Sequence, residues 1–104
     1  MSSGSYDRTS FKGLTFHDAV AGFQSGQDTP RAYLERCLAA IAERDGVVRA
    51  FVVLNEAGAR AAADAATARY KAGRALSAID GMPIGIKDLI ETIDMPTQMG
   101  CGAF

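Results

Sequence analysis

The most constraining feature of this sequence is a short apolar segment, residues 80–90, that carries a lysine close to its end. The segment reads Asp-Gly-Met-Pro-Ile-Gly-Ile-Lys-Asp-Leu-Ile. Gly81 and Pro83 are turn residues, and Pro83 fixes its own φ while it restricts Met82 to extended conformations. The residues that follow are too apolar for a surface loop, so we expect Lys87 to enter an apolar environment. Because burial disfavours the charged ammonium, it lowers the pKa of a lysine, which can then act as a base near neutral pH.

The neighbours of Lys87 allow more than one interpretation. Gly85, which stands between two isoleucines, indicates that another part of the backbone passes close by. Asp88 either orients Lys87 electrostatically or holds the following turn by accepting backbone N–H bonds. We favour the second role, because a neighbouring carboxylate would raise the pKa of the lysine and oppose a neutral base. A solvated Lys87 without a chemical role is the alternative, since long charged side chains usually keep their ends in water.

Two amphipathic segments predict an antiparallel helical hairpin early in the chain. The first helix follows Thr15 as its N-cap and ends at Gly26. The second begins at Thr29–Pro30, a capping residue followed by proline at the first helical position, and ends at Asp45–Gly46. Glu35 has no cation four residues further on, so we expect its face of the helix to be solvated. The apolar stripes consist of Phe16, Ala19, Val20 and Phe23 in the first helix and Tyr33, Leu34, Cys37, Leu38 and Ile41 in the second.

The middle of the chain predicts a strand, a helix and a second apolar run. β-Branched and aromatic residues dominate Phe51 to Leu54, which favours a short strand buried on both faces. Asn55 is the expected cap of an alanine-rich helix that runs to about Lys71, with Gly73 as its C-terminal stop. Because the apolar residues 80–90 follow this helix, the order of elements is typical of an α/β fold.

Composition and charge limit the kinds of partner that we expect for the chain. The 104 residues carry a formal net charge of −1, and no basic stripe indicates nucleic acid. No apolar run is long enough to span a membrane, and the polar residues 1–5 contain no hydrophobic signal region. We expect Cys37 and Cys101 to be free thiols in a reducing cytoplasm, with Cys37 buried and inert. The single histidine, His17, is expected at the surface, so we expect no metal or other cofactor. Residues 1–13 should have little fixed structure unless another segment holds them.

The lysine segment resembles the lysine motif of the amidase signature family, in which a glycine-x-proline turn leads through a small apolar run to lysine-aspartate. Residues 94–97 and Gly100 resemble the strand and turn that follow in the family. The resemblance implies an α/β fold in which a helical hairpin precedes the strand–helix–strand of a mixed sheet. Because members of the family are several times longer, residues 1–104 would be an incomplete N-terminal portion of an amidase domain. A truncated product and one chain of a divided protein both fit this expectation.

The resemblance also implies a reaction, the hydrolysis of a carboxamide to a carboxylate plus ammonia or an amine. The family uses a serine, a second serine in a cis peptide arrangement and a lysine, and the matching lysine here is Lys87. The glycine- and serine-rich segment that carries both serines is absent from this sequence. We therefore expect this chain to supply only the lysine and to be inactive when isolated. Its serines lie outside such a context, at Ser2, Ser3, Ser5, Ser10, Ser25 and Ser77.

The expected partners follow from that reaction. They are a small-molecule amide substrate and the remainder of the amidase polypeptide, or a second chain that carries the serines. A homo-oligomer also remains open. One alternative function is an amidotransferase-type subunit that releases ammonia for a partner enzyme. Another is a non-catalytic α/β interaction module, in which Lys87 is merely exposed.

Overall fold

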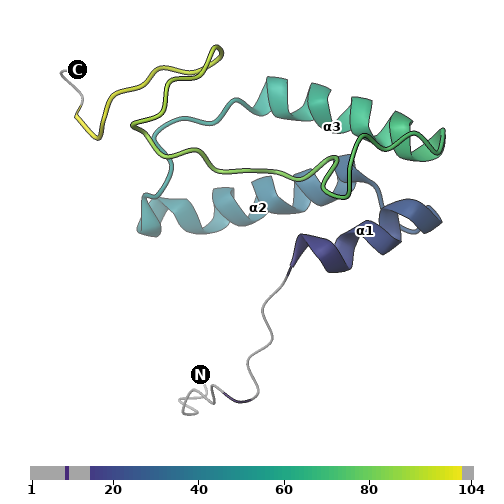
Figure 1. The fold of residues 1–104 in the computed structure, drawn as a ribbon. Coiled ribbons are helices and arrows are strands. Elements are labelled where there is room, and N and C mark those ends of the chain that lie inside the picture. Colours follow the sequence, from purple (N-terminus) through teal and green to yellow (C-terminus); the bar gives the residue numbers. More distant parts are fainter. Residues whose placement is uncertain (1–8, 10–14, 102–104) are drawn as a thin grey trace.

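The structure is a computed structural model that describes residue 9 and residues 15–101. It contains the helices α1 (Phe16–Ser25), α2 (Pro30–Val48) and α3 (Glu56–Lys71). Helices α2 and α3 lie side by side, and α1 packs near the start of α2 (Figure 1). After α3 the chain reverses its direction and runs back past the helix pair (Figure 1). None of the helices in the described part of the chain is long and apolar enough to cross a membrane. The prediction for residues 1–13 falls outside the described residues, apart from Thr9.

The predicted helix starts are confirmed by their caps. The Thr15 hydroxyl accepts a hydrogen bond from the backbone N–H of Asp18 at 3.4 Å, and it also donates to the Asp18 carboxylate at 3.1 Å. Thr29 caps α2 in the same way, because its hydroxyl accepts from the N–H of Ala32 at 3.0 Å. Such caps satisfy N–H groups that have no partner within the helix. The end of α1 is also confirmed, since Gly26 has a left-handed φ of 82°.

Helix α2 ends later than its sequence predicts. It continues through Gly46 to Val48, and Arg49 forms the C-cap with a φ of 54°. The N–H of Arg49 donates to the carbonyl of Asp45 at 2.7 Å, and the Asp45 carboxylate accepts from the N–H of Ala50 at 2.7 Å. Glycine costs about 1 kcal/mol relative to alanine inside a helix, which these contacts offset. The predicted stop at Asp45–Gly46 is therefore wrong.

A small core joins the three helices. Pro30 is the largest fully buried side chain, and the other buried apolar residues are Phe23, Leu34, Ala63 and Ala66. The ring of Phe23 packs against Tyr33 and Tyr70, with centroid distances of 5.9 and 5.4 Å. Because Ala63 and Ala66 have small side chains, α3 can approach the other helices closely. The aromatic rings then fill the remaining space where α1 meets α2 and α3.

The predicted mixed sheet is absent from the described residues. Residues 15–101 and Thr9 contain no β-strand, so the α/β prediction is wrong for this part of the chain. The side chains of Phe51 and Val52 are 42% and 64% exposed, whereas the prediction placed this segment between two covered faces. A strand needs a neighbouring backbone, and residues 52–54 and 83–86 form no backbone–backbone hydrogen bonds within the described chain. Strand propensity expresses how well a side chain fits a pleated, half-buried surface, and that surface is missing here.

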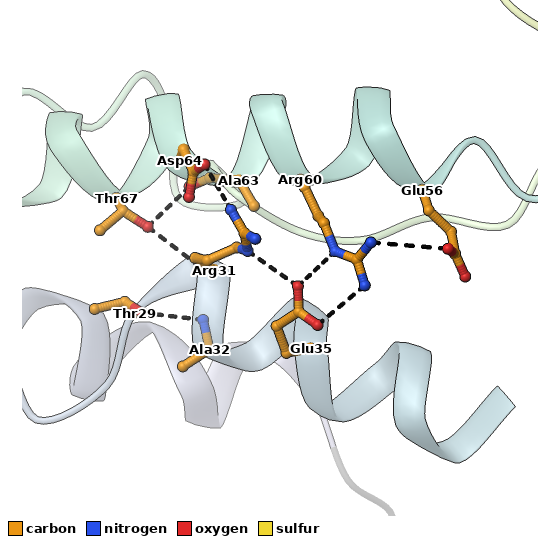
Figure 2. Close-up of polar contacts among 9 residues, drawn as sticks. All are labelled: Thr29, Arg31, Ala32, Glu35, Glu56, Arg60, Ala63, Asp64 and Thr67. Carbon is orange, nitrogen blue, oxygen red and sulfur yellow. Dashed lines mark hydrogen bonds and ion pairs between the residues drawn. The ribbon is translucent and has the colours of Figure 1, made fainter. Parts of the chain in front are cut away.

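The part of the α2 surface around Glu35, which was expected to be solvated, is the polar interface with α3 (Figure 2). Glu35 accepts from the Nε of Arg31 at 3.0 Å and from the Nε of Arg60 at 2.7 Å. Arg31 also binds Asp64 of α3 at 2.6 Å, and its backbone N–H donates to the Thr67 hydroxyl at 3.2 Å. The expectation of a solvated Glu35 is wrong because its partners precede it on α2 or come from α3. Partly exposed ion pairs contribute little energy individually, but this set fixes how α2 and α3 align.

Candidate functional site

The lysine segment begins at an ion pair whose carboxylate is buried. Arg69, near the end of α3, donates to Asp80 through two nitrogens, with distances of 2.8 and 2.7 Å. The N–H of Leu76 donates to the same carboxylate at 3.0 Å, and the Tyr70 hydroxyl donates to the Asp80 carbonyl at 2.8 Å. Asp80 is only 8% exposed. Hydrogen bonds from Arg69 hold the pKa of Asp80 at about 2, below its ordinary value of 3.8. No periodic pattern in the sequence indicated this pair, because Arg69 lies on α3 and Asp80 lies in the connection that follows the helix.

Gly81 confirms its expected role as a turn residue. Its φ is +83°, a left-handed value that favours glycine. A Cβ atom at this position would lie 2.9 Å from Cβ and Cγ of Pro30 and 3.3 Å from Cβ of Ala66. The backbone therefore crosses the start of α2 at close contact. The corresponding expectation for Gly85 is wrong, since no described atom lies within 4 Å of a Cβ built there.

Lys87 stands on the wall of an apolar groove with a volume of about 1010 Å³. The side chain of Lys87 is exposed, and no described residue forms a hydrogen bond or ion pair with its amine. Ile84 and Ile86 are 69% and 42% exposed, so the expected burial of Lys87 is corrected. The apolar run forms a groove surface that lies open to solvent instead of a closed environment. Other apolar residues that line the groove include Leu38, Ile41, Val52, Val53, Leu54 and Met82.

Asp88 takes the role that we favoured, as an acceptor of backbone N–H bonds. Its two carboxylate oxygens accept from the N–H of Gln98 at 2.8 Å and from the N–H of Gly100 at 3.0 Å. The hydrogen bond from Gln98, followed by that from Gly100, holds the pKa of Asp88 below its ordinary value. The turn that Asp88 holds lies in the second segment of the predicted family resemblance. The structure thus joins the two motifs through one carboxylate.

Another contact ties the far side of the groove to α3. The Nδ2 of Asn55 donates to the carboxylate of Asp94 at 2.6 Å, while its Oδ1 accepts from the N–H of Gly58 at 3.0 Å. Asn55 is therefore both the N-cap of α3, as predicted, and an anchor for the chain after the lysine segment. Helix α3 ends at Lys71, also as predicted. The groove thus has fixed points at both ends of the same helix, Arg69 at one and Asn55 at the other.

The remaining reactive side chains show no site of their own. Cys37 is half-buried on the groove wall, and burial raises the pKa of its thiol, which keeps it in the unreactive form. Cys101 is exposed, and so is His17, as expected. The described residues contain no group of three or more histidine, cysteine or acidic side chains arranged to hold a metal ion.

Comparison with known proteins shows the family of this chain. The profile of the Amidase family matches residues 32–104, which include Lys87 and the turn that Asp88 holds. Similar proteins include the A subunit of the glutamyl-tRNA(Gln) amidotransferase of Chloroflexus aggregans, 44% identical over 87 residues, and that of Myxococcus xanthus, 40% identical over 87 residues. Each alignment covers 84% of this chain and 18% of the relative. The corresponding mitochondrial protein of Canis lupus familiaris is 32% identical over 85 residues, 82% of this chain and 16% of that protein.

The chain belongs to the amidase family. It spans 18% of the length of the first relatives that it matches. No solved structure was found to match it.

Proposed function

We propose that this chain provides the catalytic lysine, Lys87, of an enzyme that hydrolyses carboxamides. The supporting observation is that Lys87, within the region that matches the Amidase family, lines an apolar groove next to two anchored turns. Residues 1–104 would be the N-terminal portion of the amidase domain. The remaining polypeptide, or a second chain, would complete the site.

In the proposed reaction Lys87 is a base that acts through a serine hydroxyl. A serine hydroxyl is a weak nucleophile and needs a base, which a neutral amine provides. One serine hydroxyl would relay the proton to Lys87 while the other attacks the amide carbon. The proton would then return to the departing nitrogen, and water would hydrolyse the acyl-enzyme. The oxyanion of the tetrahedral intermediate requires N–H donors, which would come with the serines.

The described serines are not the ones proposed for this reaction. The hydroxyl of Ser25 donates to the carbonyl of Gly22 at the end of α1, at 3.1 Å. That of Ser77 accepts from the N–H of Ile79 at 3.2 Å, in the connection after α3. Neither serine lines the groove of Lys87. Both hydroxyls of the mechanism would therefore come from outside the described residues.

The state of the amine links the groove to the chemistry. An amine exposed to water is protonated at neutral pH, and a protonated lysine cannot accept the proton of a serine. Apolar surface laid over the groove would withdraw water from Lys87 and disfavour its ammonium form. The exposed isoleucines that precede it, Ile84 and Ile86, would supply apolar surface on one side of the lysine, and the covering segment would supply the other side. We therefore expect Lys87 to become a base only when the groove is covered.

The relatives favour one version of this reaction, the release of ammonia by one component of an amidotransferase. Each of these relatives is named as the A subunit of a glutamyl-tRNA(Gln) amidotransferase. That name describes a protein that transfers an amide group and works with other subunits. For this chain the corresponding donor would be the carboxamide of glutamine or asparagine. A stand-alone amidase acting on another small carboxamide is the second candidate. Delivery of ammonia to a partner enzyme would separate the two.

A chimaera tests the role of Lys87 directly. The region of the Chloroflexus aggregans protein that aligns with this chain would be replaced by this sequence, and the product assembled with its partner subunits. We expect release of ammonia from glutamine, and a loss of about 10³-fold or more in kcat for Lys87→Ala. Lys71→Ala is the matched control, since Lys71 is an exposed lysine at the end of α3, away from the groove. A Lys87→Ala chimaera that keeps full activity would exclude the catalytic role.

Two measurements on the native protein complete the test. The intact mass of native material and of any co-purifying chain should reveal a polypeptide that carries the serines. The purified 104-residue chain should show no turnover with a panel of carboxamides and aryl amides. Turnover by that chain alone would overturn the assignment of roles.

A further inference from the structure

The turn held by Asp88 has the geometry of an anion-binding site. Met99 and Gly100 both have left-handed φ values, 53° and 74°. Backbones of this kind turn successive N–H groups toward one point and form a concave site for an anion. In this chain the N–H groups of Gln98 and Gly100 point to the two oxygens of Asp88. The anion in the site is therefore the side chain that follows Lys87 directly.

This contact fixes the main chain on the C-terminal side of Lys87. The carbonyl of Lys87 itself accepts from the N–H of Ile90 at 3.1 Å, which closes a tight turn beside the Asp88 contact. On the N-terminal side the closest anchored points are Gly81, which packs against Pro30, and Met82, whose N–H donates to the carbonyl of Ile79 at 3.1 Å. Ile84 and Ile86 are exposed between these points and Lys87. The position of Lys87 on the groove wall thus depends mainly on what holds residue 88.

The carboxylate of Asp88 forms no ion pair with its neighbour Lys87 within the described chain. Both carboxylate oxygens of Asp88 face backbone N–H donors, and the amine of Lys87 is bound by no described residue. The other charged residues that line the groove have partners of their own. Those pairs are Glu56 with Arg60, Arg69 with Asp80, and Asp94 with Asn55, and the remaining titratable side chain on the groove wall is Cys37.

We propose that Asp88 is a positioning residue for Lys87, because its carboxylate occupies the anion-binding turn of residues 98–100 and so fixes the lysine on the groove wall. The negative charge next to the base is thereby bound by backbone donors and opposes a neutral amine less. This inference depends on the proposed role of Lys87. It assigns to the aspartate of the motif a task separate from proton transfer.

The contact of Asp88 with the turn of residues 98–100 can be tested on the 104-residue chain without an activity measurement. NMR spectra recorded as the pH falls should show the amide signals of Gln98 and Gly100 moving together, with a midpoint below the ordinary aspartate value of 3.8. Asp88→Asn should abolish that transition, and Asp64→Asn, a change in the α2–α3 interface away from the groove, should leave it intact. A transition that survives Asp88→Asn, or none in the unmodified chain, would overturn the proposal.

The positioning role is tested in the chimaera described above. Asp88→Ala should lower kcat by about tenfold or more, because a displaced base loses its alignment with the reacting atoms. KM should stay within about twofold, since the substrate is not bound by Asp88. Added formate should not restore kcat, because formate can fill the empty turn but does not tie that turn to the backbone of residue 88. Asp64→Ala serves as the control, with unchanged kcat and no response to formate.

The outcomes separate this inference from the proposed function. If Lys87→Ala remains active, the catalytic role of the lysine fails, whatever Asp88 does. If Lys87→Ala is inactive and Asp88→Ala is fully active, the positioning role fails alone. In Asp88→Asn the acid limb of the kcat profile should keep its position. A limb displaced to lower pH would mean that Asp88 acts on Lys87 through its charge, and would contradict the proposal.

Discussion

The guanidinium of Arg69 and the carboxylate of Asp80 bind each other through two parallel contacts of 2.8 and 2.7 Å. This pair joins the last turn of α3 to the first residue of the lysine segment. Geometry of this kind is specific as well as strong, because the planar guanidinium matches both carboxylate oxygens. The path of the chain from Asp80 to Lys87 is therefore set from the end of a helix.

Replacing Asp80 should destabilise the chain. Asp80→Asn removes the charge from a site that is 8% exposed and leaves Arg69 without its partner. We expect the free energy of unfolding in urea to fall by about 2 kcal/mol. Asp64→Asn is the control, since its side chain is 58% exposed and its pair with Arg31 contributes less than about 1 kcal/mol. Equal effects of the two substitutions would contradict a dominant role for the pair of Asp80 with Arg69.

The pair of Arg69 and Asp80 should make the free energy of unfolding depend on pH. The pKa of Asp80 is about 2 in the folded chain, against an ordinary value of 3.8. Because the folded value is the lower one, the stabilisation is present above pH 3.8 and is lost as the pH falls toward 2. The loss should amount to about 2 kcal/mol. Urea unfolding at a series of pH values measures it.

Other carboxylates with lowered pKa values, such as Asp28 and Asp94, act in the same direction. The contribution of Asp80 is therefore the difference between the unmodified chain and Asp80→Asn. That difference should shrink between pH 4 and 2, the range set by the two pKa values. A constant difference over this range would show that the pKa of Asp80 is not lowered.

Gly81 and Gly85 form a matched pair of positions for substitution. Alanine at Gly81 would face a φ of +83° and a contact of 2.9 Å with Pro30. We expect Gly81→Ala to cost about 2 to 4 kcal/mol from backbone strain and overpacking together. Gly85→Ala should change stability by less than about 0.5 kcal/mol, because the space around Gly85 is open. Thermal and urea unfolding of the two variants would show the contrast.

The two cysteines should differ in reactivity. Cys101 is exposed, whereas Cys37 is half-buried and burial raises the pKa of its thiol. Thiolates are the reacting species, so iodoacetamide at pH 8 should modify Cys101 well before Cys37. Mass spectrometry of the Cys37→Ser and Cys101→Ser variants would give the two rates separately. Similar rates in the folded chain would contradict the packing of Cys37, and unfolding in urea should remove the difference.

The helices were predictable because their signals are local. A capping hydroxyl at Thr15 or Thr29 reaches N–H groups within the next turn, so its effect is readable from sequence spacing. The sequence also predicts the kind of role that Asp88 has, which is to accept backbone N–H bonds. It does not predict the partners at Gln98 and Gly100, because a turn ten or more residues away leaves no periodic pattern.

The wrong predictions share a different cause, which is that each depends on contacts with parts of the chain far away in sequence. Propensity predicts a strand for the apolar run Phe51 to Leu54, yet a strand exists only where a second backbone exchanges hydrogen bonds with it. The spacing of charges within α2 predicts a solvated Glu35, but its partner Arg60 lies on α3, which that spacing does not describe. The close backbone expected at Gly85 was inferred from its neighbours in sequence, and the structure places that contact at Gly81.

The sequence by itself determined where the helices begin, which faces are apolar, and the motif that places a lysine before an aspartate. These features depend on backbone conformation and side chains within a few residues of one another. Only the tertiary structure decided that Arg69 holds Asp80, that Gly81 crosses Pro30, and that the apolar segments line a groove and form no sheet within the described residues. Those outcomes depend on contacts between residues far apart in the chain, and their energies arise only when the helices have packed.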